Sequence, residues 1–249
     1  MYFIFLFLSG LAAGFINTLA GGGSVLVLPV LILAGLPSPI ANATNRVAIL
    51  LQNITGSYRF HAYKKLEIKP VIHIALAAIV GSIAGSLFAV RIDSALFDKI
   101  LGIIFIFILL LILRSKKNHT RVRANLPRWI EILIFLGVGF YGGFIQVGVG
   151  FIFLATLNLI EDFDLVRANA VKVFIVMCYT FFAVLIFTIN GMIIWKYGLI
   201  LALGNILGAF IGVRTAVKKG ETVIKVVLAV AIIAACMKLF GVFSLIGLE

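Results

Sequence analysis

The stretch Leu19-Ala20-Gly21-Gly22-Gly23-Ser24 interrupts an apolar run that extends from Tyr2 to Leu33 and contains Pro29 near its end. Each glycine in a helix interior costs about 1 kcal/mol relative to alanine, so three in succession favour a break in the helix. Broken backbone at membrane depth leaves amide and carbonyl groups unpaired unless protein or a water-filled cavity satisfies them. The sequence therefore predicts a helical hairpin whose glycine turn could hold a transported substrate.

The composition of the whole chain indicates an integral membrane protein. Of its 249 residues, 63% are hydrophobic and only 12% are charged, whereas soluble domains carry about 25% charged residues. Several apolar runs approach the roughly 20 residues that a spanning helix requires, and no alternating segments suggest a β-barrel. We therefore expect an all-α, multi-pass membrane protein in which residues 1–249 form a single transmembrane domain.

The basic character of the chain follows from its membrane orientation. The net charge is +12, but the Lys and Arg residues fall mostly between the apolar segments, as the positive-inside rule requires. Cys178 and Cys236 lie in apolar runs without metal-ligand spacing, and the glycine triplet lacks the Gly-Lys-Ser/Thr of a phosphate-binding loop. We expect a lipid bilayer as the surroundings, and no nucleic-acid partner, metal, cofactor or enzyme activity.

Two halves of the chain carry similar sequences in the same order. The matches are residues 10–17 with 139–146, Gly21 with Gly150, Ala41-Asn42-Ala43 with Ala168-Asn169-Ala170, and Gly81, Gly85 and Arg91 with Gly204, Gly208 and Arg214. They predict a first repeat over residues 1–113, a basic cytoplasmic linker over 114–128 and a second repeat over 129–249. The segments Ile193 to Val213 and Val223 to Ile246 are expected to close the second repeat as separate helices.

Loop charge predicts how the two repeats are oriented. Basic clusters at Lys64 to Lys69, in the linker and at Arg214 to Lys219 mark one cytoplasmic side. Residues Trp129 to Ile160 must then enter and leave on that side, and by symmetry Tyr2 to Leu33 enters and leaves on the outer side. Each repeat becomes a Gly-broken hairpin followed by three transmembrane helices, and the repeats have inverted topology. Two full crossings per hairpin give the same topology, but the short Val25 to Leu33 favours a re-entrant hairpin.

The glycine breaks supply the first group of candidate binding residues. Helix N-termini present unpaired amide donors with positive partial charge, which suit an anion. Gly150 and Phe151 are expected to open the second piece of the second hairpin. The candidates at the two turns are Asn17, Thr18, Gly21, Gly22, Gly23 and Ser24 in the first repeat and Gln146 and Gly150 in the second. The alternative is that these polar residues only cap the breaks or join helices.

A second group follows the Pro37 and Pro39 turn and recurs in the second half. Its members are Asn42, Thr44, Asn45 and Arg46, with Asn169 and Lys172 as their counterparts. A basic residue near a helix end can simply snorkel to the surface. The expected topology, however, puts Arg46 toward the outside and Lys172 toward the cytoplasm, which symmetrical anion handling requires.

Acidic residues are absent from the centres of the expected spanning segments. Cation pumps and carboxylate proton relays place Asp or Glu inside the helix bundle. This pattern argues against a cation transporter. Any proton coupling would need another group or the substrate itself.

The residues Gly14-Phe-Ile-Asn17-Thr18-Leu-Ala20-Gly21-Gly22-Gly23-Ser24, together with Gly35-Leu36-Pro37 and Ala41-Asn42-Ala43-Thr44-Asn45-Arg46, resemble the TauE/SafE family of sulfite and organosulfonate exporters. The resemblance covers nearly the whole chain. It implies export of small sulfur oxyanions, such as sulfite, sulfoacetate or related organosulfonates, across a prokaryotic plasma membrane. The second repeat departs from the first, with Gln146 in place of Asn17 and only Gly150 kept from the triplet.

We therefore expect a secondary transporter that binds a small anion between inverted repeats and alternates its exposure. A passive channel for small anions or neutral solutes, lined by the same turns, is the alternative. A third hypothesis is a membrane-embedded sensor or assembly component that transports nothing. The sequence leaves the exact substrate, the coupling ion, the direction of flux and a homo-oligomeric state open.

Overall fold

The computed structural model describes residues 2–19, 21–114, 126–160 and 163–239, and the described chain is helical without strands. The elements are α1 Tyr2–Leu19, α2 Ser24–Leu33, α3 Ser38–Ala62, the short 3-10 helix η1 Lys69–Val71, α4 Ile72–Arg91, α5 Ser94–Arg114, α6 Arg128–Phe144, α7 Val149–Ile160, α8 Leu165–Ile189 and α9 Trp195–Leu239. The predicted linker over 114–128 connects α5 to α6 and lies mostly outside the described residues.

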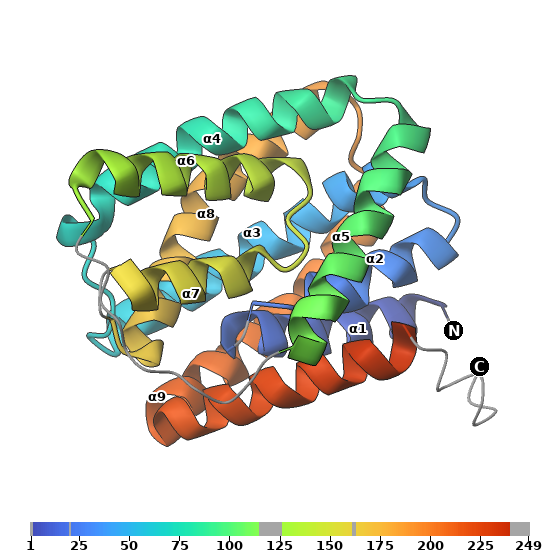
Figure 1. Cartoon of the computed structure of the whole chain (residues 1–249). Coiled ribbons are helices and arrows are strands. Elements are labelled where there is room, and N and C mark those ends of the chain that lie inside the picture. Colours follow the sequence, from blue (N-terminus) through green and yellow to red (C-terminus); the bar gives the residue numbers. More distant parts are fainter. Residues whose placement is uncertain (1, 20, 115–125, 161–162, 240–249) are drawn as a thin grey trace.

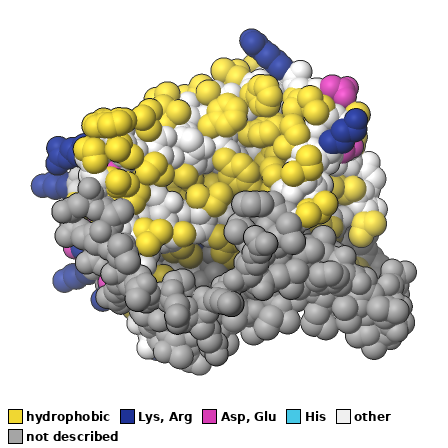
Figure 2. All heavy atoms as spheres, viewed as in Figure 1, with side chains coloured by type: hydrophobic (Ala, Val, Ile, Leu, Met, Phe, Trp, Pro, Cys, Tyr) yellow, Lys and Arg dark blue, Asp and Glu magenta, His cyan; other side chains and the backbone are white. Residues whose placement is uncertain are grey.

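The helices and the surface suit a bilayer. Three described helical stretches, Lys69–Arg91, Leu165–Ile189 and Trp195–Lys218, are long and apolar enough to cross a membrane. On the face drawn in Figure 2, hydrophobic side chains cover the middle, and the charged side chains gather at the two ends. The helices and their apolar stretches confirm the expectation of an all-α membrane protein.

Both glycine-rich breaks are present. The chain leaves α1 at Leu19 and re-enters a helix at Ser24, so the predicted interruption at Gly21 to Gly23 is confirmed. In Figure 1 the chain runs along α1 to this turn and back along α2, so the outer ends of both helices lie on the right, while α6 and α7 have their outer ends on the left. The second hairpin resumes at Val149, one residue before the predicted opening at Gly150, because the left-handed Gly148 forms the turn instead.

The last part of the second half differs from the prediction. Helix α9 runs from Trp195 to Leu239 as one element of 45 residues, so the predicted loop around Arg214 and Lys218 is helical. A straight helix of this length would measure about 68 Å, roughly twice the hydrocarbon thickness of a membrane. The helix is not straight: in Figure 1 its orange and red limbs meet at a sharp bend, which shortens its extent. The basic residues do not stop the helix because Lys and Arg are good helix formers.

Glycines let two helix pairs approach backbone to backbone. In the first pair, α1 lies along the first limb of α9, and in the second, α6 lies along α4. The recurring contacts are Gly10 with Leu201 and Gly14 with Asn205 in the first pair, and Gly139 with Ala78 and Gly143 with Ser82 in the second. Each pair thus joins a helix from one half of the sequence to a helix from the other half, with the same spacing.

Helices α3 and α8 form the centre of the bundle. They contact each other, α3 also packs on α9, and α8 also packs on α4. Most of α3 is buried, including the polar residues Asn42, Arg46, Gln52 and Asn53. These polar side chains explain why α3 is not among the clearly apolar spanning helices, although its 25 residues are long enough to cross.

Candidate functional site

The two glycine turns touch at the centre of the molecule. A Cβ atom built on Gly21 would collide with the backbone of Gly150, and one built on Gly150 would collide with Gly21. Gly21 also has φ +88°, a left-handed conformation that side chains rarely adopt. Glycine is therefore required at this contact for space at both positions and for conformation at Gly21.

The second hairpin is held by α3. Asn42 Nδ2 donates to the Phe144 carbonyl over 2.9 Å, and the Arg46 guanidinium donates to the carbonyls of Gly142 and Gly143. These carbonyls end α6 and have no partner within the helix. A cation there also complements the negative end of the helix dipole. The arginine expected to meet substrate therefore caps a helix of the opposite half.

The first hairpin is held by α8 in the same way. Asn169 Nδ2 donates to the Leu19 carbonyl over 2.9 Å, and Lys172 Nζ donates to the Asn17 carbonyl over 2.8 Å. Lys172 Nζ also reaches the Thr18 carbonyl at 3.5 Å and Asn169 Oδ1 at 2.6 Å. All of these groups are buried. The recurrence of an Asn and a basic residue in the two halves thus corresponds to one structural task performed twice.

A small pocket opens beside the two turns, with a cavity volume of about 20 Å³. It is lined by Asn17, Gly21, Ser24, Ile49, Gln52, Asn53, Gln146, Val149, Gly150, Lys172 and Val176. Among the described residues of this lining, Lys172 is the only charged one, and none is a carboxylate. The pocket thus combines one cation, several neutral hydrogen-bonding groups and an apolar wall.

Neither buried cation has an acidic partner among the described residues. The ion pairs found there are His73 with Glu131 and Arg167 with Glu67, away from the pocket. Arg46 and Lys172 are 0% and 2% exposed, and burying a charge without a counter-charge is costly. The helix carbonyls offset part of this cost. An anion in the pocket would offset more of it.

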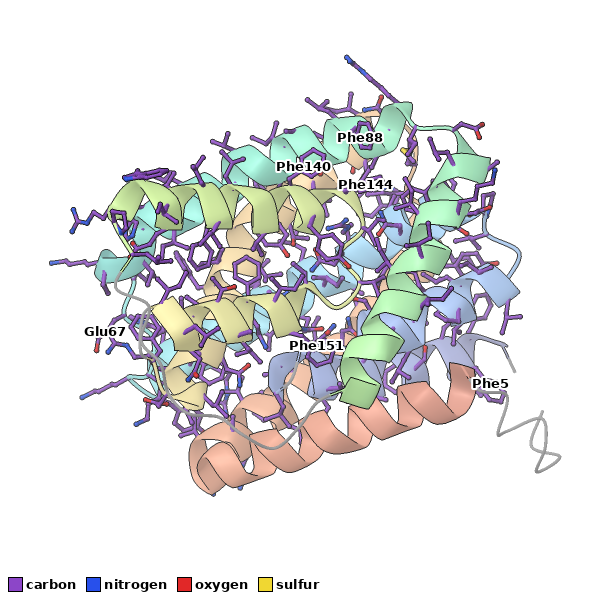
Figure 3. The ribbon with its side chains drawn as sticks, viewed as in Figure 1. Phe5, Glu67, Phe88, Phe140, Phe144 and Phe151 are labelled. Atoms are coloured by element: carbon purple, nitrogen blue, oxygen red, sulfur yellow. The ribbon has the colours of Figure 1, made fainter. Side chains whose placement is uncertain are left out.

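Six of the predicted residues line this pocket: Asn17, Gly21, Ser24, Gln146, Gly150 and Lys172. The other predicted residues lie around it and have structural contacts. Thr18 donates to the Gly14 carbonyl, Gly22 lies against the ring of Phe151 (labelled in Figure 3), and the Gly23 amide donates to Asn17. Thr44 Oγ1 accepts from the Ile194 amide, and Asn45 is buried with its Nδ2 unpartnered in the described chain.

The sequence alone did not predict five lining residues: Ile49, Gln52, Asn53, Val149 and Val176. It also missed Tyr179, whose hydroxyl donates to Gln146 Oε1 over 3.0 Å. Gln52 and Asn53 carry a signal that sequence can offer, because they are adjacent amides inside an apolar segment. Ile49, Val149 and Val176 carry none, since apolar residues are ordinary there.

Long apolar helices, two broken hairpins that meet inside the bundle and a buried polar pocket define a multi-pass membrane protein of the transporter class. The sequence profile described as "Sulfite exporter TauE/SafE" matches residues 6–239. This chain belongs to that family.

Relatives from several bacteria align over most of the chain. It is 28% identical to the "Probable membrane transporter protein ORF9" of Sinorhizobium sp, over 95% of this chain and 92% of the relative. It is 29% identical to a "Probable membrane transporter protein" of Haemophilus influenzae, covering 88% and 87%, and to YfcA of Escherichia coli K12, covering 92% and 87%. No solved structure matches the chain. The family and these names indicate a membrane transporter rather than an enzyme.

Proposed function

We propose that this protein is a secondary transporter that exports small sulfur oxyanions, such as sulfite, sulfoacetate or related organosulfonates, across the plasma membrane. The observation that carries the proposal is the central pocket, where Lys172 is the only charged residue of the described lining and lies beside the contact between Gly21 and Gly150. A cation without a carboxylate partner favours an anionic ligand. The family description supports a sulfur oxyanion.

Helix ends add to the preference for an anion. Ser24 begins α2 and Gly150 lies in the first turn of α7, and both line the pocket. The Val25, Leu26, Val149 and Phe151 amides donate to carbonyls of the turns, so what the two helix starts offer the pocket is mainly the positive partial charge of a helix N-terminus. In this proposal the two hairpin turns hold the anion, while Asn42, Arg46, Asn169 and Lys172 hold the turns.

Alternating access would use two inverted repeats. The outer ends of the first hairpin lie on one side of the molecule and those of the second hairpin on the other (Figure 1). The matched capping of α6 by Arg46 and of α1 by Lys172 supports the same relation. In this scheme the pocket lies between the repeats and is exposed to each side in turn.

Flux measurements on purified protein in liposomes test this function. Wild-type protein should accelerate the movement of sulfite or sulfoacetate, and Lys172→Met should reduce it strongly, because the only cation of the pocket is removed. The matched control is Lys196→Met, since Lys196 is exposed at the start of α9. Equal flux for wild-type protein and Lys172→Met would contradict the site, and no anion flux at all would contradict the function.

A passive anion channel is the competing function, and counterflow distinguishes the two. A carrier exchanges substrate, so unlabelled anion on the far side should accelerate uptake of labelled anion. A channel shows no such acceleration. Absence of counterflow together with rapid anion leak would therefore favour the channel.

A further inference from the structure

The chain contains two glutamines, Gln52 and Gln146, and both line the central pocket. Gln52 comes from α3, and Gln146 comes from the turn between α6 and α7. The two residues are 2% and 4% exposed. An amide carries a donor end and an acceptor end, so what each glutamine offers to the pocket depends on which end is already occupied.

The orientation of Gln52 is fixed through Asn17. The Gly23 amide donates to Asn17 Oδ1 over 2.6 Å, and Asn17 Nδ2 donates to Gln52 Oε1 over 3.2 Å. A backbone amide can only donate, so the Asn17 atom that faces it must be oxygen. The Asn17 nitrogen then faces Gln52 and requires an oxygen there. Gln52 Nε2 is left as the end available to a ligand.

The orientation of Gln146 is fixed by Arg46 and Tyr179. Arg46 Nη1 donates to Gln146 Oε1 over 2.6 Å, and the Tyr179 hydroxyl donates to the same oxygen over 3.0 Å. A guanidinium has no acceptor, so the Gln146 atom that faces it must be oxygen. Gln146 Nε2 is again the available end. The two glutamines of the pocket are therefore turned the same way by unrelated sets of neighbours.

Both amide nitrogens lack a protein partner. Neither Gln52 Nε2 nor Gln146 Nε2 makes a hydrogen bond within the described chain, and neither is enclosed like the unpartnered Asn45 Nδ2. Lys172 differs from them, because its three N–H groups have three acceptors: the carbonyls of Asn17 and Thr18 and Asn169 Oδ1. Lys172 thus supplies charge to the pocket, while the glutamines have donors free for contact.

We infer that Gln52 and Gln146 bind the ligand directly through their NH₂ groups, and that Asn17, Arg46 and Tyr179 are positioning residues that fix these amides. The inference deepens the proposed function and rests on it. The ligand class is an oxyanion that offers at least two oxygen lone pairs, one to each half of the molecule. Such neutral donors hold an anion without a direct ion pair, so no ion pair has to break when the ligand is released.

Binding of sodium methanesulfonate to the detergent-solubilised full chain tests the inference. Methionine is nearly isosteric with glutamine but has no donor. A hydrogen bond to a charged group is worth about 1.5–3 kcal/mol, so Gln52→Met and Gln146→Met should each weaken binding at least about tenfold. The control is Asn190→Ala, which removes an exposed amide at the end of α8 and should leave binding unchanged.

A double-mutant cycle tests the positioning role of Asn17. If Asn17 acts through Gln52, then Asn17→Ala should weaken methanesulfonate binding in the wild type but add little in the Gln52→Met background. Its effect on thermal stability should be present in both backgrounds. Additive losses of binding would mean that Asn17 contacts the anion itself, which would overturn the relay from Gly23 to Gln52.

The outcomes separate this inference from the proposed function. Wild-type binding that survives both glutamine substitutions would overturn the inference and leave anion transport in place. Failure of the wild type to bind or transport sulfite, sulfoacetate or methanesulfonate would overturn the proposed function itself. Loss of binding in both glutamine variants, with unchanged Asn190→Ala, would support the inference.

Discussion

Arg46 and Lys172 occupy exchanged positions, because each caps the broken helix of the opposite half. Arg46 in α3 donates to the last turn of α6, and Lys172 in α8 donates to the last turn of α1. The ends of the two hairpins are therefore fixed by the other half of the chain rather than by their own. A change at either basic residue should loosen the hairpin that lies across from it.

Replacing Arg46 with methionine should destabilise the protein strongly. The change leaves the buried Gly142 carbonyl without its donor, and leaves the Gly143 carbonyl with the Ser86 hydroxyl as its remaining donor. A buried unsatisfied acceptor costs about 1–3 kcal/mol, so a total loss of about 2 kcal/mol or more is expected. Unfolding in mild detergent measures it.

The control for this experiment is Arg91→Met, since Arg91 is exposed in the last turn of α4. Surface substitutions of this kind change stability by about 0.5 kcal/mol or less. Equal melting of both variants would mean that the Arg46 cap contributes nothing to stability. A lysine at position 46 should recover only part of the loss, because it lacks the planar guanidinium fork.

Substitution of Gly21 by alanine should abolish transport. The new Cβ would meet the backbone of Gly150 and would also sit at φ +88°. Gly35→Ala separates these two effects, because Gly35 has φ +86° but nothing within 4 Å of the added carbon. Both variants pay the conformational cost of about 1 kcal/mol or more, while only Gly21→Ala pushes the hairpin turns apart. Liposome flux of sulfite compares them.

Gly150→Ala provides a second test of the same contact. Gly150 lies in α7 without positive φ, so its added Cβ acts by space alone. Transport should fall as it does in Gly21→Ala. Normal flux in both variants, with protein of normal stability, would contradict a role for the contact between the turns.

Gly85→Val and Gly208→Val should have similar effects, although they lie far apart in the sequence. Gly85 of α4 packs on the α6 backbone near Phe140 and Phe144, which Figure 3 labels, and Gly208 of α9 packs on the α1 backbone near Leu11 and Phe15. Valine at either site would force a helix pair apart, and overpacking costs about 1–3 kcal/mol. Thermal unfolding in detergent should show comparable losses.

The open position for comparison is Gly102 in α5, where an added Cβ would meet nothing within 4 Å. Gly102→Val should leave the melting temperature nearly unchanged. A large loss of thermal stability for Gly85→Val with none for Gly208→Val would mean that the two helix pairs contribute unequally to stability. It would weaken the structural equivalence of the halves.

The sequence predicted the parts of the fold that depend on local chemistry. The break at Gly21 to Gly23 was accessible because consecutive glycines destabilise any helix. The pairing of Asn42 and Arg46 with α6 was not, because it depends on which helix end lies 96 to 102 residues away. The α9 continuation past Lys218 was missed because basic residues mark membrane sides but do not end helices. The role proposed for Gln52 could not be predicted either, because it depends on the hydrogen bond that its oxygen accepts from Asn17.

Cysteine labelling tests the inverted topology, in a background with Cys178 and Cys236 replaced by serine. Leu33, at the outer end of α2, and Asn190, after α8, are predicted to face outward, while Lys65 and Arg128 are predicted to face the cytoplasm. All four positions are exposed. A membrane-impermeant maleimide should therefore label Leu33→Cys and Asn190→Cys in intact cells, and Lys65→Cys and Arg128→Cys only after permeabilisation. Labelling of Leu33→Cys and Arg128→Cys from the same side would mean that the two hairpins enter from one face, and alternating access between inverted repeats would fail.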